Sequence, residues 1–123
     1  MLKKEIAGSF LKLAASGNII EAYDRYVDHN FVHHNQYFKG DRHALMAAMA
    51  DAYNKIPNKS IEIKHIYQDG DNVITHSKIL QKTEDLASVA VVHIFKFKEN
   101  RIVELWDLGQ EIIKDSPNEN GPF

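Results

Sequence analysis

Apolar residues in the first half of the chain recur every three or four positions, the period of a helix with one buried face. This spacing predicts a helix over residues 3–15 and a second helix over about 19–27. A third helix is predicted from an N-cap at Asp41 to about Asn54, because aspartate can accept hydrogen bonds from the free backbone N–H groups of a first turn. Gly17 suits the left-handed turn that closes the first helix.

The second half of the chain alternates apolar and polar residues, as strands with one buried face do. Strands are predicted over about residues 60–67, 73–81, 87–98 and 101–113. The segments 69–72 and 99–100 favour tight hairpin turns, and Glu84 and Asp85 are expected in a solvated loop. Helices followed by hairpin-linked strands predict an α+β fold, with three N-terminal helices packed on a curved antiparallel sheet in a single domain over residues 1–123.

Composition narrows the function mainly by exclusion. The net charge is only -2, which gives no electrostatic reason to expect nucleic acid or an anionic membrane as a partner. The sequence has no cysteine, so disulfides, thiolate catalysis and thiolate zinc sites are excluded. No apolar run approaches the roughly 20 residues of a membrane span, and the amphipathic N-terminus is unlike a secretion signal. We therefore expect a cytoplasmic protein.

Histidine is the unusual component, with seven residues in the chain. Several of them lie in the segment 28–40, which has neither helical nor strand periodicity and is rich in His, Asn and aromatic residues. We expect four histidines to be exposed: His29, His33, His43 and His65.

Short motifs occur in a characteristic order along most of the chain. They are His34-Asn35 after an aromatic residue, DGDNVITH at 69–76, HIFKFKENRIVE at 93–104, ELWDLGQ at 104–110 and NGPF at 120–123. Together they resemble the SnoaL-like polyketide cyclase family of the nuclear-transport-factor-2-like superfamily, close to a bacterial subgroup of predicted aldol-condensing enzymes. The resemblance implies a cone-shaped α+β barrel around one small-molecule pocket.

The resemblance also implies candidate catalytic residues. It places Asp107, His34 and His76 at the pocket, and His93 where most members have an aspartate that stabilises an enolate. In this family a carboxylate or histidine removes a proton beside a carbonyl group, and no cofactor is required. A neutral His93 can donate a hydrogen bond or act as a base. Further residues are expected to line the pocket or bind substrate: Asn35, Phe31, Tyr37, Phe95, Leu105, Trp106 and Gln110.

The turn before the last strand decides which face Asp107 occupies. A two-residue turn at 99–100 places His93 opposite Trp106 and points Asp107 to the other face. A three-residue loop over 98–100 places His93 and Asp107 on one face. The family's preference for glycine at position 100 favours the longer loop, and the sequence leaves both arrangements open.

These residues support competing functions. The first is a cofactor-free acid/base enzyme of the aldol cyclase or isomerase type, acting on a small carbonyl-containing or cyclic apolar substrate. The alternative is a non-catalytic carrier, favoured because His93 and Leu105 replace the family's usual aspartate and histidine. A His/Asp metal site is a third reading, but the residues have no short spacing motif, so we assign neither a metal nor a cofactor. Because the strands are apolar on both faces and members of this fold commonly dimerise, we expect a homodimer through the outer sheet face.

Overall fold

The computed structural model describes residues 1–81 and 86–123. Its elements in chain order are α1 (Lys3–Ala15), α2 (Ile19–Tyr26), β1 (Val27–His33), α3 (Arg42–Lys55), β2 (Lys59–Asp69), β3 (Asn72–Gln81), β4 (Val89–Lys98) and β5 (Arg101–Glu111). The predicted helices and hairpin strands are therefore confirmed, with small differences at their ends. The loop expected at Glu84 and Asp85 lies outside the described residues.

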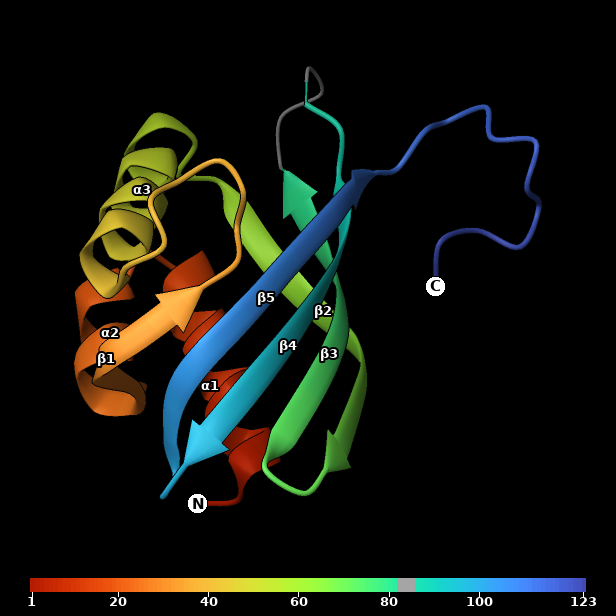
Figure 1. Ribbon diagram of the computed structural model, residues 1–123. Coiled ribbons are helices and arrows are strands. Elements are labelled where there is room, and N and C mark those ends of the chain that lie inside the picture. The colour runs from red at the N-terminus through yellow and green to blue at the C-terminus, as the bar shows by residue number, and fades with distance from the viewer. Residues whose placement is uncertain (82–85) are drawn as a thin grey trace.

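The strands form one sheet in the order β1-β5-β4-β3-β2, with the helices gathered over one face (Figure 1). Neighbours from β2 to β5 are antiparallel, whereas β1 runs parallel to β5. The first strand corrects the expectation that residues 28–40 are wholly irregular. Its pairing with β5 is interrupted between Val27 and Val32, and an exposed stretch separates its buried residues, so no regular alternation is visible in the sequence.

Aromatic side chains join the helices to the inner face of the sheet. The Phe10 ring lies 5.5 Å from Tyr23 and 5.9 Å from Phe95, both edge to face, and Phe31 contacts Tyr23 in the same way at 6.1 Å. Each such pair adds about 0.5–1.5 kcal/mol beyond the area that it buries. Phe31 is 2% exposed and Phe95 0%, so both belong to the core, and the expectation that they bind substrate is wrong.

The ends of the helices confirm two predictions from the sequence. The Ala44 N–H donates to Asp41 Oδ1 at 2.8 Å, which makes Asp41 the N-cap of α3. Gly17 closes α1 with φ of +89°, and a Cβ there would lie 2.4 Å from the ring of Tyr53. Only glycine therefore fits both the turn after α1 and the close approach of α3 to it.

The hairpin between β4 and β5 has a two-residue turn. Glu99 and Asn100 have φ values of 51° and 64°, and Lys98 pairs with Arg101. Two successive left-handed residues form a type I′ turn, whose twist matches that of the flanking strands. The three-residue loop that the family's glycine preference favoured is not formed.

A β-bulge in β5 returns Asp107 to the face of His93, although the two-residue turn alone would point it to the other face. The pairing register shifts between Lys96 and Phe97, where Val103 is an extra residue in β5. A shift of one residue sends every later side chain to the opposite face of the sheet. Asp107 consequently lies opposite His93, on the face that the helices cover.

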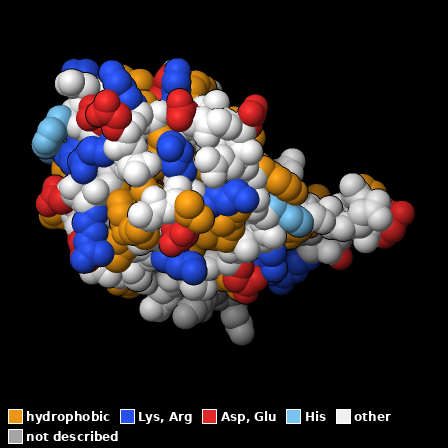
Figure 2. All heavy atoms as spheres, turned by 90° about the horizontal axis from the view of Figure 1, so that it is seen from below, with side chains coloured by type: hydrophobic (Ala, Val, Ile, Leu, Met, Phe, Trp, Pro, Cys, Tyr) orange, Lys and Arg blue, Asp and Glu red, His pale blue; other side chains and the backbone are white. Residues whose placement is uncertain are grey.

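The surface carries mixed charge. Seen from below the view of Figure 1, lysine, arginine and acidic side chains are interspersed with apolar ones (Figure 2). Within the described residues, no helix has the length and apolarity needed to span a membrane.

Candidate functional site

A cavity of about 270 Å³ lies between the helices and the inner face of the sheet. Most of its wall is apolar and comes from three sources: Phe10 and Ala14 of α1, Met49 and Ala52 of α3, and Ile79 and Leu105 of the sheet. His93, Asp107 and Lys59 add polar groups to this lining. An apolar cavity with a few convergent polar groups is the usual form of a small-molecule site.

Asp107 is held by two neighbours at the polar side of this cavity. Asn35 Nδ2 donates to Asp107 Oδ2 at 3.0 Å, and His93 Nε2 lies 3.4 Å from Asp107 Oδ1. The second distance is slightly longer than a good N–H···O bond, so Oδ1 is less tightly held than Oδ2. The Asp107 side chain keeps 26% of its surface exposed, which leaves its carboxylate accessible to a small molecule.

Burial controls the charge of His93. Desolvation lowers the pKa of its imidazole below the ordinary value of 6.5, and the negative charge of Asp107 opposes that effect. We conclude that His93 is neutral at pH 7, with one ring nitrogen protonated. Nε2 faces Asp107, whereas Nδ1 is buried with no hydrogen-bond partner among the described residues.

His33 builds the loop that delivers Asn35 to Asp107. Its Nδ1 accepts from the Asn35 N–H at 3.1 Å, so the proton is on Nε2, which donates to the Lys39 carbonyl at 2.6 Å. The Tyr37 N–H donates to Asn35 Oδ1 at 3.1 Å and fixes the other side of the amide. His33 is 5% exposed, so the expectation of a solvent-facing histidine is wrong.

The structure places His34 beside the outer face of β5. Its Nε2 lies 2.6 Å from Glu104 Oε2, and its ring stacks on Trp106 at 4.7 Å. Glu104 and Trp106 alternate with Leu105 and Asp107 along β5, so the two pairs point to opposite faces. His34 and Trp106 therefore do not line the 270 Å³ cavity as expected, although His34 borders a second hollow that Asp107 also lines.

His76 also lies on the outer face. Its ring stacks 5.7 Å from His65 and lies 5.0 Å from Phe123, whereas its chain neighbours Thr75 and Ser77 are buried on the inner face. The expectation that His76 lies at the pocket is therefore wrong, because successive side chains of a strand point to opposite faces.

A second hollow of about 550 Å³ adjoins the cavity. Asp107, Lys59 and Ile79 line both spaces, and residues 34–37 border the hollow. Tyr37 lies there with 80% of its surface exposed. Gln110 pairs with Ala90 on the outer face and is exposed, so it does not line the cavity as expected.

Of the expected site residues, the structure brings together Asp107, His93, Asn35 and Leu105. Lys59 was missed, although it stands two residues before Ile61 and therefore on the same face of β2. Burial lowers the pKa of its ammonium group. Within residues 1–81 and 86–123, no group of three or more His, Asp or Glu side chains is placed to hold a metal ion.

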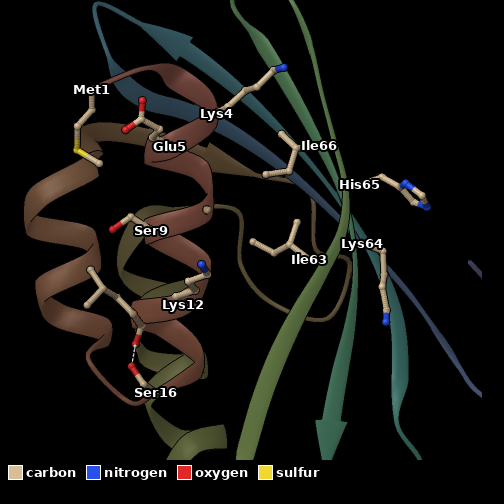
Figure 3. Close-up of a pocket in the computed structure, with 12 residues that line it drawn as sticks. Met1, Lys4, Glu5, Ser9, Lys12, Ser16, Ile63, Lys64, His65 and Ile66 are labelled. Carbon is tan, nitrogen blue, oxygen red and sulfur yellow. Dashed lines mark hydrogen bonds between the residues drawn. The ribbon is translucent and has the colours of Figure 1, made fainter.

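A larger groove of about 760 Å³ runs between α1 and β2. Ile63 and Ile66 point from β2 toward α1, whereas Lys64 and His65 point away from it (Figure 3). Lysines and Glu5 border this open groove, and its lining contains none of the polar groups that meet at Asp107. The smaller cavity is therefore the better candidate for chemistry.

Comparisons with known proteins agree with this architecture. The family model described as a SnoaL-like domain matches residues 8–105. A cystatin-fold protein from Novosphingobium aromaticivorans is similar at 17% identity and a TM-score of 0.73, over 88% of this chain and 98% of that one. A predicted polyketide cyclase from Acidithiobacillus ferrooxidans is 18% identical with a TM-score of 0.73, over 88% and 87% of the chains.

A predicted SnoaL-like polyketide cyclase from Jannaschia sp. CCS1 has a TM-score of 0.74 at 12% identity, over 88% of this chain and 85% of that one. Identities this low establish a shared fold and not a shared reaction. A search of curated proteins finds no match.

Proposed function

The chain belongs to the SnoaL-like domain family, and from its site we propose a cofactor-independent acid/base enzyme of the aldol cyclase or isomerase type. Its substrate is a small carbonyl-containing or cyclic apolar molecule. One observation carries the proposal: the Asp107 carboxylate, held by Asn35 and His93, borders an apolar cavity of about 270 Å³.

In this proposal Asp107 is the base. Oδ1 takes a proton from the carbon beside the substrate carbonyl, and the electron pair moves into an enolate. Asn35 binds Oδ2 and keeps the carboxylate oriented. The neutral His93 imidazole donates Nε2–H to the negative charge, first on Asp107 and then on the enolate oxygen. Asp107 returns its proton either to another carbon, which isomerises the substrate, or to the alkoxide formed when the enolate attacks a second carbonyl.

Exchange of carbon-bound hydrogen in D₂O tests this step without knowledge of the natural substrate. Cyclic ketones of one and two rings are incubated with the protein, and loss of the α-proton signals is followed by ¹H NMR. Asp107→Asn keeps the shape of the side chain and is expected to slow exchange by about 10²–10⁴-fold, the range for a lost general base. His65→Gln, on the outer face, is the matched control and should exchange at the wild-type rate.

A carrier function is the second candidate, and Leu105 favours it. Leu105 gives the cavity an apolar wall at the position where many members of the family have a histidine. The distance of 3.4 Å between His93 Nε2 and Asp107 Oδ1 is also long for a catalytic pair. The same experiment separates the two functions. Ketones that bind, as detected by line broadening, but exchange no faster than in buffer contradict the enzyme and support the carrier.

We also propose a homodimer through the outer sheet face. Ile74, Ile94 and Trp106 form a half-buried row across three neighbouring strands, and Leu108 beside them is 61% exposed. Leu108→Glu is expected to shift the mass measured by light scattering at micromolar concentration from dimer to monomer. A monomeric mass for the unmodified protein contradicts this proposal.

A further inference from the structure

Several buried polar atoms on the inner face of the sheet have no hydrogen-bond partner among the described residues. They include Thr75 Oγ1, Ser77 Oγ and His93 Nδ1. Thr75 and Ser77 are both 0% exposed, and His93 is 8% exposed. Because an unpaired buried polar group costs about 1–3 kcal/mol, such groups in native proteins find partners close by.

The pairing of the strands identifies the neighbour of His93. Thr75 lies directly opposite His93 between β3 and β4, and His93 lies directly opposite Asp107 between β4 and β5. Side chains in directly opposite positions have Cβ atoms roughly 4.5–5.5 Å apart. Ser77 pairs with Val91 instead and is only a diagonal neighbour of His93. One row of side chains therefore crosses three strands, from Thr75 through His93 to Asp107. At the end of this row, Asn35 donates a hydrogen bond to Asp107.

A hydroxyl group is chemically suited to His93 Nδ1. When Nε2–H faces Asp107, Nδ1 is an acceptor and requires a donor. If the ring gains a second proton, Nδ1–H becomes a donor, and the same hydroxyl oxygen can accept from it. Thr75 is fully buried and does not line the cavity, so it is not positioned to act as a nucleophile on a bound molecule.

We propose that Thr75 is a positioning residue: its hydroxyl, through one buried water, holds His93 in the tautomer that presents Nε2–H to Asp107 and the cavity. The inference rests on the proposed function for the catalytic use of His93. The tautomer itself is a property of the protein without substrate, so it is tested separately from the reaction.

The test is the ¹⁵N NMR spectrum of the imidazole rings in the labelled full-length protein at neutral pH, with His93 assigned by its loss in His93→Gln. In the wild type, Nε2 is expected to carry the proton and Nδ1 to have the shift of an unprotonated acceptor. Thr75→Val keeps the side-chain shape without the hydroxyl and should raise the ratio of Nδ1–H to Nε2–H tautomers roughly threefold to tenfold, the range for one hydrogen bond. Thr75→Ser should restore the wild-type ratio.

Ser77→Ala is the matched control, because it removes a buried hydroxyl that is not opposite His93. The proposal is overturned by a wild-type spectrum with Nδ1 protonated, by a Thr75→Val spectrum identical to wild type, or by a change in Ser77→Ala alone. If Thr75→Val does not fold, Thr75→Cys replaces it with a weaker donor and the same expected direction. A shifted tautomer in a protein that exchanges no ketone protons contradicts the proposed function and leaves this inference intact.

Discussion

Ala52 lines the cavity from α3, and its replacement by leucine tests whether the cavity can accept a larger side chain there. The change adds three carbon atoms, each occupying roughly the 30 Å³ of a water molecule in the liquid, so the added atoms fill about a third of the cavity. Burial of each methylene contributes about 0.8 kcal/mol, which gives roughly 2.4 kcal/mol in total. Fixing the leucine rotamer costs about 0.5–1 kcal/mol. Ala52→Leu should therefore raise the free energy of unfolding by about 1.5–2 kcal/mol.

Urea denaturation followed by circular dichroism measures this free energy, with an unchanged m-value as the check on two-state unfolding. Ala47→Leu is the matched control, because residue 47 is exposed on the same helix and the two residue types have similar helix propensity. A loss of more than 1 kcal/mol in Ala52→Leu, with the control unchanged, would refute the reasoning, since it would indicate overpacking of a filled wall. The stabilised variant should also exchange ketone protons more slowly, because its cavity is smaller.

Further changes test the charge of His93 and the backbone of two turns. The pKa of His93 is lowered in the folded protein, so between that pKa and the ordinary value of 6.5 the unfolded chain binds more protons than the folded one. The stability that comes from keeping His93 neutral is therefore present above pH 6.5 and is lost as the pH falls through the folded pKa. His93→Gln should remove this fall in the free energy of unfolding, which is at most about 1.4 kcal/mol per pH unit. Urea titrations between pH 7 and 4 measure it, and equal slopes of the unfolding free energy against pH in both proteins contradict the prediction. Gly17→Ala should lower the free energy of unfolding by about 2–3 kcal/mol, because the φ of +89° disfavours alanine and the added Cβ would meet Tyr53. Gly70→Ala, with a φ of +59° and open space around it, should lower it by only about 1 kcal/mol. Equal losses would show that the Tyr53 ring moves aside at little cost. Glu99→Asn should gain about 0.5–1 kcal/mol in thermal unfolding, because asparagine adopts a φ of 51° more readily than glutamate, and a loss would argue against the type I′ turn.

The helices and hairpins could be predicted because their signals are local. The cap at Asp41 and the glycine at position 17 act on residues within one helical turn, and both appear in the structure as expected. The strand β1 could not be predicted in this way. It exists because β5, from the other end of the chain, pairs with it in parallel, and an exposed stretch interrupts its own pattern.

The candidate site was only partly predictable for a related reason. The resemblance supplied positions along the strands but not the faces on which they lie, so His76 was expected at the cavity although its side chain points outward. Asp107 was expected beside His93 through a longer turn, and the structure achieves the same juxtaposition with a bulge at Val103. A valine in a bulge has no distinctive sequence signal, because packing of the surrounding residues decides where the extra residue lies.

The bulge at Val103 decides which side chains of β5 face the cavity without changing which strand β5 pairs with. If the same residues paired with β4 in an unbroken ladder, His93 would lie opposite Trp106. Glu104 and Trp106 would then point toward the helices, and Leu105 and Asp107 would point away from them. An acid and a large aromatic ring would border the cavity in place of the present wall. Two relatives with identical residues in β5 would therefore differ in the chemistry of their cavities if only one of them formed the bulge.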